Sequence, residues 1–286
     1  MARRVVGVIG GTGLYAMEGL RDAGEIRVDT PFGQPSDAYH KGTLGETELV
    51  FLPRHGRGHR LLPSEINFRA NIFGMKKLGV EWIVSVSAVG SLREEIEPGH
   101  LLIPDQFIDR TTQRASTFFG RGIVAHVSLA DPFCPALRDI FIAAAKEAGA
   151  SVHPSGTYVC MEGPQFSTRA ESHLYRSWGA HVIGMTNLQE AKLAREAEIC
   201  YVTLALASDY DCWNPHAAEV DIRQVIEVLQ KNVRLAQSVI GKGVARLPER
   251  RDCPCASALK DAIITERGLI PAAVREELAP IVGKYL

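Results

Sequence analysis

The chain has 286 residues, of which 46% are hydrophobic, 23% charged and 7% aromatic, a composition typical of a globular protein and not of a disordered one. Its 32 Lys and Arg nearly balance 33 Asp and Glu, so the formal net charge of -1 favours neither nucleic acid nor an anionic membrane as a partner. No apolar run approaches the ~20 residues that span a bilayer, and no signal-peptide pattern is present, so we expect a cytoplasmic protein.

Short apolar segments rich in β-branched residues alternate with segments of helical periodicity. This alternation is typical of βα units around a mostly parallel sheet, so we predict an α/β fold. The predicted strands are Val5–Ile9, Glu48–Leu52, Trp82–Val86, Leu101–Pro104, Thr157–Cys160, His181–Gly184 and Tyr201–Ala207.

Helical segments lie between these strands. Predicted helices run from Pro63-Ser64 to Gly79, from Pro135 to Gly149, from a capping box at Thr168 and Glu171, from Asp221 to Ile240 and from Pro271 to Tyr285. We expect one catalytic domain over residues 1–240. Residues 241–286 are expected to form a linker and a helical extension packed on the same domain, because so short a tail cannot build its own core.

Six cysteines are too few for a disulfide scaffold. Only Cys253-Pro254-Cys255 brings two of them close together, and no further Cys or His follows at a zinc-type spacing. The sequence therefore predicts no metal site. A surface pair without a fixed role and a strained, reducible disulfide are both open interpretations of this motif.

Residues that can donate hydrogen bonds follow several predicted strands. Ligands of an open parallel sheet bind beyond the carboxyl ends of its strands, where these side chains are expected to meet. They are Thr12, Arg54, His55, Ser87 and Thr186. All of them can donate to an oxyanion, and Arg is the side chain best matched to phosphate, so this edge is predicted to bind a phosphate.

The glycine-rich segment Gly10-Gly11-Thr12-Gly13 leaves other interpretations open. A looser dinucleotide-binding pattern accepts Ala16 as its third small residue, which makes a nicotinamide-dependent oxidoreductase the first alternative. That alternative leaves the donors on the other strands unexplained. A plain glycine-rich turn is also possible, whereas a P-loop is excluded because no Gly-Lys-Ser/Thr follows.

Two carboxylates, Asp209 and Asp211, follow the strand Tyr201–Ala207. Such a pair suits a metal site, glycosidase-type acid and base work, or the binding and protonation of a heterocycle; a helix cap or structural ion pair is the plain alternative. With a phosphate at the same edge of the sheet, protonation of a departing base fits best.

At these residues the sequence resembles the trimeric purine nucleoside phosphorylase family, and most closely its branch that acts on 5′-methylthioadenosine. The resemblance extends to about residue 240. Its specific stretches are Gly10–Leu14, Pro53–Gly56, Asn67–Ala70, Gly90–Glu95, Pro104–Thr112, Glu162–Pro164, Gly184–Thr186 and Ser208–Trp213. The resemblance implies a single α/β domain with a distorted, mixed central sheet, assembled as a trimer or hexamer.

The resemblance also implies roles for individual residues. Phosphate contacts fall on Thr12, Arg54, His55, Ser87, Thr186 and the backbone of Ala88. Met185 is implied to lie against the ribose, Met161 and Phe166 to flank the base, and Asp209 and Asp211 to hold N7 and the 6-amino group of adenine. Ser167 and Ile222 match positions that shape specificity, while His126, from a neighbouring subunit, and His59 are implied to lie near the 5′ substituent.

The implied reaction is phosphorolysis, in which phosphate attacks C1′ as the purine leaves, with Asp209, His55 and Arg54 as the catalytic residues and no metal or organic cofactor. Salvage of purine and methionine is the implied role. Asn187 and Gln189 depart from the family pattern. Adenosine-type, inosine-type and methylthioinosine phosphorylases are the alternatives within the family, and a non-catalytic nucleoside-binding protein is the alternative outside it.

Overall fold

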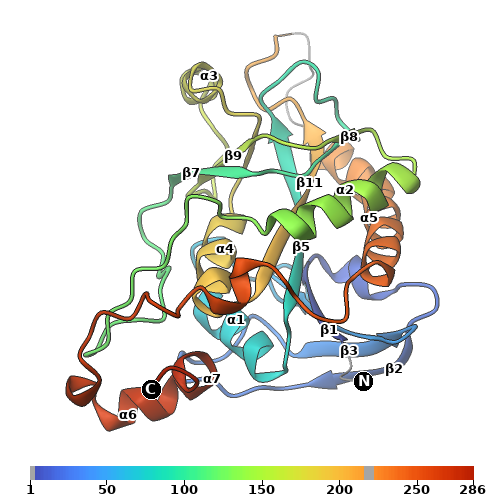
Figure 1. Ribbon diagram of the computed structural model, residues 1–286. Helices are drawn as coiled ribbons and strands as arrows, with labels where there is room; N and C mark the ends of the chain where they lie inside the picture. Colours follow the sequence, from blue (N-terminus) through green and yellow to red (C-terminus); the bar gives the residue numbers. More distant parts are fainter. Residues whose placement is uncertain (1–3, 216–221) are drawn as a thin grey trace.

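The computed structural model describes residues 4–215 and 222–286 (Figure 1). Its central feature is a mixed sheet. The main path of the sheet runs through β2 (Arg21–Ile26), β3 (Tyr39–Leu44), β4 (Thr47–Pro53), β1 (Arg4–Gly10), β5 (Trp82–Ser91), β10 (Val182–Gly184), β9 (Thr157–Met161) and β7 (Gln106–Arg110). A branch leaves β5 through β11 (Cys200–Asp209), β6 (Leu101–Leu102) and β8 (Val152–His153).

Strand β5 is where the sheet divides. Its first half lies between β1 and β11, parallel to both, and its last residues pair with β10 in antiparallel fashion. β11 follows β5 to the pair Asp209 and Gly90, with an irregularity after Ala207. Nearly all of β5 is buried, but Ala88 is exposed in the middle of this central strand. Solvent therefore reaches β5 at this position.

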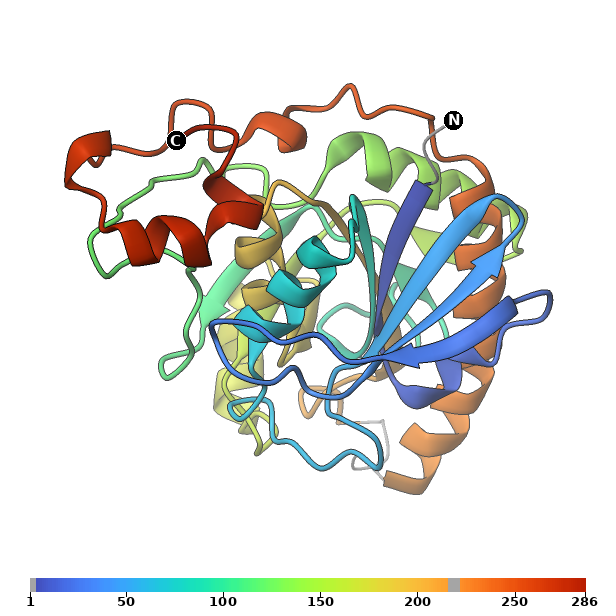
Figure 2. The same ribbon diagram turned by 90° about the horizontal axis from the view of Figure 1, so that it is seen from below.

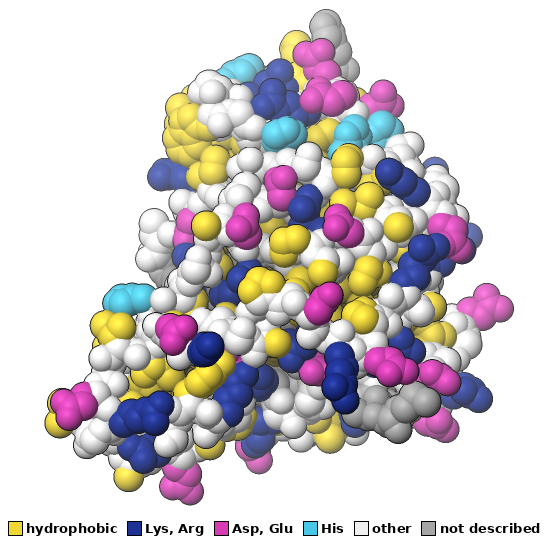
Figure 3. Space-filling model, in the orientation of Figure 1, with side chains coloured by type: hydrophobic (Ala, Val, Ile, Leu, Met, Phe, Trp, Pro, Cys, Tyr) yellow, Lys and Arg dark blue, Asp and Glu magenta, His cyan; other side chains and the backbone are white. Residues whose placement is uncertain are grey.

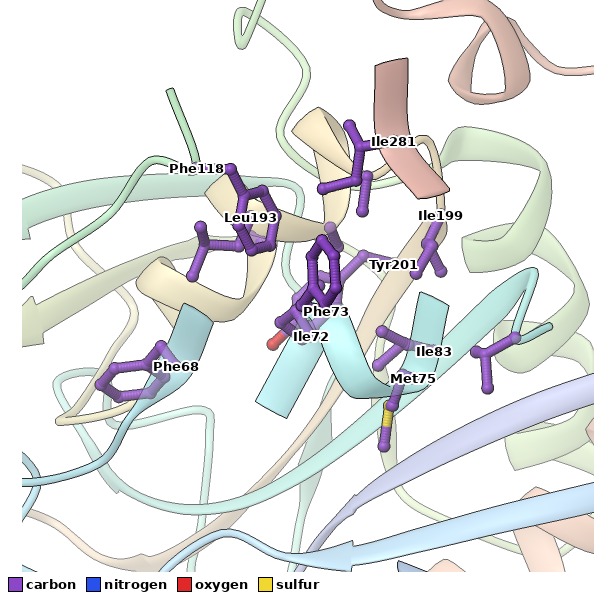
Figure 4. Close-up of a cluster of buried hydrophobic side chains, with 14 of the residues drawn as sticks. Phe68, Ile72, Phe73, Met75, Ile83, Phe118, Leu193, Ile199, Tyr201 and Ile281 are labelled. Carbon is purple, nitrogen blue, oxygen red and sulfur yellow. The ribbon is translucent and has the colours of Figure 1, made fainter. Parts of the chain in front are cut away.

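Helices cover both faces of the sheet. They are α1 (Phe68–Lys77), α2 (Pro135–Glu147), α3 (Arg169–Ser177), α4 (Asn187–Glu196), α5 (Ile222–Ala245), α6 (Ala272–Glu277) and α7 (Ala279–Val282). Consecutive strand residues point to opposite faces, so Ile83 packs in one hydrophobic cluster with α1 and α4, and Val84 packs in another with α2 and α5. Figure 4 shows the first cluster, in which Phe73 lies between Leu193 on one side and Ile83 on the other.

The predicted α/β class and all seven predicted strands are confirmed, with differences at their ends. β5 continues to Ser91 and β11 to Asp209, so Ser87 and Asp209 lie within strands and not in the loops after them. Strands β2, β3, β7 and β8 and helix α4 were not predicted. β2 reads Arg-Asp-Ala-Gly-Glu-Ile and is almost wholly exposed, so it carries no apolar pattern that could reveal it.

Two helix predictions were wrong in detail. The helix expected to start at Pro63-Ser64 begins only after Asn67, whose side chain accepts a hydrogen bond from the Ala70 amide, 3.1 Å away. The C-terminal helix is interrupted at Leu278, because Pro280 is tolerated only in a first helical turn, and the new helix α7 begins at Ala279. The predicted start of α5 at Asp221 lies outside the described residues.

The C-terminal segment packs on the sheet domain. Val274, Leu278 and Ile281 share the hydrophobic cluster of α1 and α4, and α6 and α7 lie on the side of the molecule away from α5 (Figure 2). Basic and acidic side chains are interspersed on the face shown in Figure 3. Among the described helices, none is long and apolar enough to cross a membrane.

Candidate active site

Arg54 is buried where β1 and β4 end, and its backbone N–H donates to the Gly10 carbonyl at 3.0 Å. Its guanidinium forms an ion pair with Glu190, with Nε 2.5 Å from Oε1. Burial alone would lower the pKa of Arg54, but the adjacent Glu190 carboxylate outweighs burial and raises that pKa above its ordinary value. Arg54 is thus a fixed, permanently charged group.

The guanidinium has few free donors. Besides Glu190, its Nη2 donates to Ser85 Oγ at 2.6 Å and its Nη1 donates to the Val86 carbonyl at 3.0 Å. A guanidinium has five N–H bonds, so one hydrogen on Nη1 stays available for a ligand. The guanidinium that the sequence predicts as a phosphate ligand is therefore committed mostly to the protein, with a single N–H and its charge left for a ligand.

A buried polar cluster surrounds this ion pair. Asn187 donates to Ser85 Oγ at 2.9 Å and accepts from the Tyr158 hydroxyl at 2.9 Å, while the Tyr201 hydroxyl donates to Glu190 at 2.8 Å. Asn187, which departs from the family pattern, thus has a structural role in the polar cluster behind Arg54. Gln189 likewise bonds to other side chains, donating to Thr111 at 2.8 Å.

His55 differs from the sequence-based expectation. Its Nδ1 lies 2.8 Å from the Leu61 carbonyl, which can only accept, so Nδ1 carries the proton. Burial lowers the pKa of His55 to about 4 despite that bond, so the ring is neutral at pH 7 and Nε2 is an acceptor. In the free protein Nε2 of His55 is therefore an acceptor, and the donation expected from the sequence would require the ring to be protonated. Its Nε2 instead suits a protonated phosphate oxygen.

This lowered pKa predicts that acid destabilises the protein through His55. The native ring takes up a proton only near pH 4, whereas the unfolded chain does so near 6.5, so the free energy of unfolding falls as pH drops between these values. The loss amounts to about 3 kcal/mol at 1.36 kcal/mol per pKa unit. Urea unfolding at pH 7.5 and 4.5 should show a smaller pH effect for His55→Gln than for wild type. The exposed control His173→Gln should behave like wild type; an unchanged pH effect in His55→Gln would contradict this prediction.

Other predicted phosphate ligands lie on β5 and at the starts of α4 and η1. Thr186 is buried and precedes α4, but its side chain caps no backbone N–H of that helix, so its hydroxyl is free to serve a ligand. The first turn of α4 also directs unpaired N–H groups to this place. Ser87 is buried beside Ala88, with Oγ 3.5 Å from the Tyr158 hydroxyl. Thr12 begins a short 3₁₀ helix, η1 (Thr12–Tyr15), and its side chain lies outside what the structure describes.

The two carboxylates lie together at the end of β11. Asp209 accepts from the Asp211 amide on Oδ1 and from the Ser208 hydroxyl on Oδ2, both at 2.7 Å. Burial raises the pKa of Asp209, and burial followed by the charge of Asp209 raises the pKa of Asp211. Oδ2 of Asp211 is buried with no partner among the described atoms. A carboxyl pair of this kind is suited to share a proton and to accept polar hydrogens of a ligand.

The residues expected around the base are brought to the same end. Ser167 lies next to Met161, with Oγ 3.7 Å from the sulfur, and also adjoins Asp211. Phe166 is 64% exposed, which leaves its ring available for stacking. Met185 packs tightly against Gly163, where a Cβ would come within 2.5 Å of the Met185 sulfur.

Three further predicted residues have no described contact with the carboxylates. His59 is exposed and stacks on His55, with ring centroids 4.1 Å apart. His126 is exposed, lines a cavity of about 510 Å3 and donates through its backbone N–H to the Ala262 carbonyl at 2.9 Å. The segment that joins β7 to α2, which contains His126, extends to the lower left of Figure 1, whereas β11 ends near the top. The side chain of Ile222 lies outside the described parts.

Sequence reasoning missed Glu190 and Arg114. Arg114 binds Glu162 through Nε at 2.8 Å and donates to the backbone carbonyls of Glu162 and Met185. It thereby ties the segment after β9 to the segment after β10. A single Arg in a polar loop and a single Glu in a helix give no periodic signal, so only the fold could reveal either partner.

The fold and these residues together define a class of protein. Residues 5–245 match the phosphorylase superfamily. S-methyl-5′-thioadenosine phosphorylase from Geobacter sulfurreducens is 62% identical over 284 residues, covering 99% of each chain. The enzyme of the same name from Hyperthermus butylicus is 51% identical over 265 residues, covering 91% of this chain and 95% of the other.

Solved structures agree with these relatives. A methylthioadenosine phosphorylase from an Antarctic soil metagenomic library matches with a TM-score of 0.94 and 49% identity, covering 98% of this chain and 99% of that one. A mutant adenosine/methylthioadenosine phosphorylase from Schistosoma mansoni, in complex with methylthioadenosine, matches with a TM-score of 0.80 and 36% identity. The match covers 87% of this chain and 93% of that one. The chain belongs to the methylthioadenosine phosphorylase family within the phosphorylase superfamily.

Proposed function

We propose that this protein catalyses the reversible phosphorolysis of 5′-methylthioadenosine to adenine and 5-methylthioribose 1-phosphate. The observation that carries the proposal is the pairing of two unlike sites along β5 and its neighbours. One is an anion site with Arg54 and the start of α4, and the other is the raised-pKa carboxyl pair Asp209 and Asp211. Phosphorolysis needs both, since an anion must attack while a base leaves.

The anion site prepares the nucleophile. Arg54 supplies fixed charge and one N–H, and Thr186 supplies a hydroxyl beside the N–H groups of α4. His55, neutral and with Nε2 as acceptor, takes a hydrogen bond from a phosphate O–H and so turns an unprotonated oxygen towards C1′. Phosphate placed beneath the sugar also stabilises the positive charge that grows there in the transition state.

The carboxyl pair assists the leaving group. Because burial raises the pKa of Asp209, its carboxyl can hold a proton and donate it to N7 as negative charge builds on the purine. The 6-amino group has two hydrogens, which the other oxygen of Asp209 and the Oδ2 of Asp211 can accept. This division of roles favours a 6-amino purine over a 6-oxo purine, and it requires no metal or organic cofactor.

A panel of nucleosides tests this function. Methylthioadenosine, adenosine and inosine are incubated with the protein with and without phosphate, and free base and sugar 1-phosphate are measured. We expect release of adenine from methylthioadenosine that depends on phosphate and exceeds inosine cleavage by ~10²-fold or more in kcat/KM. Release without phosphate would indicate a hydrolase, and binding without any release would indicate a nucleoside-binding protein.

We further propose that the protein works as a homo-oligomer, most simply a trimer, in the cytoplasm, where its products would enter purine and methionine salvage. His126 is exposed on a segment directed away from the end of β11, so we infer that a neighbouring subunit supplies the His126 that reaches a 5′ substituent.

His126→Ala should raise the KM for methylthioadenosine by about tenfold, or ~1.4 kcal/mol, and leave adenine affinity nearly unchanged. His173→Ala is the exposed control. A fully active monomer in analytical ultracentrifugation would contradict the assignment.

A further inference from the structure

Four of the six cysteines converge at one point, although they are far apart in the sequence. Cys134 precedes α2, Cys200 begins β11, and Cys253 and Cys255 lie at the 3₁₀ helix η2 (Pro254–Ser257). Their four sulfur atoms all lie within 4.8 Å of one another. The motif Cys253-Pro254-Cys255 is therefore not a surface pair, since Cys255 is buried and both sulfurs face two further thiols.

The distances fit four ligands around one ion. The sulfurs of Cys200 and Cys253 are 3.2 Å apart, well beyond the ~2.05 Å of a disulfide bond, and all four cysteines are free thiols. In a tetrahedral zinc site with Zn–S bonds of ~2.3 Å, the sulfurs are ~3.8 Å apart. A set confined within 4.8 Å needs only small side-chain adjustments to reach this arrangement.

The four positions are held by backbone that is already ordered. The Cys134 amide donates to the Tyr201 carbonyl and the Cys200 amide to the Glu81 carbonyl, both at 3.0 Å. Cys255 is fixed within η2, where its carbonyl accepts from the Ala258 amide at 3.4 Å. The sulfurs are thus gathered by the sheet, by the start of α2 and by the C-terminal segment together.

The surroundings offset negative charge. Arg251, two residues before Cys253, donates to the Glu198 carbonyl at 2.7 Å and pairs with the Glu81 carboxylate at 3.0 Å, while Arg195 and Cys255 line the same cavity of about 290 Å3. Four thiolates around a divalent ion carry a net charge of about -2, which the positive charge of nearby Arg195 partly offsets. The cavity also gives an ion a path from solvent to Cys255.

We propose that Cys134, Cys200, Cys253 and Cys255 bind one Zn²⁺ ion in a closed, structural site. As four Zn–S bonds form, the four thiols release their protons to solvent, and no group is oxidised or reduced. With all four positions taken by sulfur, the ion has no open position for a substrate. It joins the C-terminal segment to β11, the strand that ends at Asp209, and to α2.

Metal content of the full chain tests the proposal. Protein purified under reducing conditions without chelators should contain about one zinc per chain by mass spectrometry of the metal. The double variant Cys253→Ser/Cys255→Ser should lose it, whereas Cys160→Ala, which removes a buried thiol outside the cluster, should retain it. Protein produced in cells grown with cobalt in place of zinc should show the absorption of thiolate-to-cobalt charge transfer. A chelator that strips the ion should lower the Tm of wild type by several degrees and leave the Tm of the double variant unchanged.

Other results would overturn the assignment. Wild-type protein that contains no metal would contradict a zinc site. This holds if titration finds the four thiols reduced, and it holds if a lower protein mass shows that they have formed disulfides. Zinc retained by the double variant at the wild-type level places the ion elsewhere. Iron in place of zinc, with its visible absorption, would show a different centre. Because wild-type metal content decides the matter alone, the test holds even where the double variant fails to fold.

Discussion

Replacing Asp209 by Asn should lower kcat/KM for methylthioadenosine by ~10²-fold or more and shift the remaining preference towards 6-oxo purines. The carboxyl group is half-buried at the end of β11, and burial raises its pKa. A protonated carboxyl can donate to N7, and the other oxygen can accept from a 6-amino group. An amide lacks the acidic proton and presents a donor to O6, so it loses the general acid and reverses the match.

Wild type and Asp209→Asn are compared by their steady-state rates of free-base release from methylthioadenosine and from inosine, both at saturating phosphate. Asp139→Asn makes the same chemical change at an exposed position of α2 and should leave both rates unchanged. If Asp209→Asn keeps the wild-type rate and preference, Asp209 neither donates to N7 nor reads the 6-amino group.

The second large effect concerns the buried ion pair. Glu190→Gln should lower the free energy of unfolding by about 3–5 kcal/mol, because it leaves the Arg54 charge buried without a counter-charge. Arg54 cannot escape this cost by losing its proton. Two hydroxyls that now donate to Glu190, from Ser85 at 2.6 Å and Tyr201 at 2.8 Å, would also lose a charged acceptor.

Urea unfolding at fixed protein concentration measures this loss. Glu276→Gln on α6 is exposed and should change the free energy of unfolding by less than about 0.5 kcal/mol. A Glu190→Gln protein as stable as wild type would show that Arg54 is not held by this carboxylate, and the geometry of the anion site would need another explanation.

Much of the fold could be predicted because buried parallel strands carry continuous apolar runs. Val5–Ile9 and Trp82–Val86 were found on this basis, and the capping box at Thr168 and Glu171 appears as predicted. Helix α4 was missed because its buried face includes Asn187, Gln189 and Glu190, which serve the polar cluster and disrupt the apolar pattern. These buried polar residues thus prevented the helix from being recognised in the sequence.

The candidate site was inferred from the rule that ligands bind at strand ends. That rule located Arg54 and Asp209, but it could not show which hydrogen bonds Arg54 already makes, nor which nitrogen of His55 carries the proton. Those properties depend on Glu190 and Leu61, partners that only the folded chain supplies. The cysteine cluster was missed for the same reason, because Cys134 and Cys200 are distant in sequence from the Cys253-Pro254-Cys255 motif.

The most direct test of the central claim, that phosphate is the nucleophile, follows the atoms of phosphate into the product. Methylthioadenosine is cleaved in the presence of phosphate labelled with heavy oxygen, and the sugar product is analysed by mass spectrometry. We expect 5-methylthioribose 1-phosphate that carries every labelled oxygen of the phosphate, formed in equal amount with adenine. Free methylthioribose without label, released at the same rate when phosphate is omitted, would contradict the account.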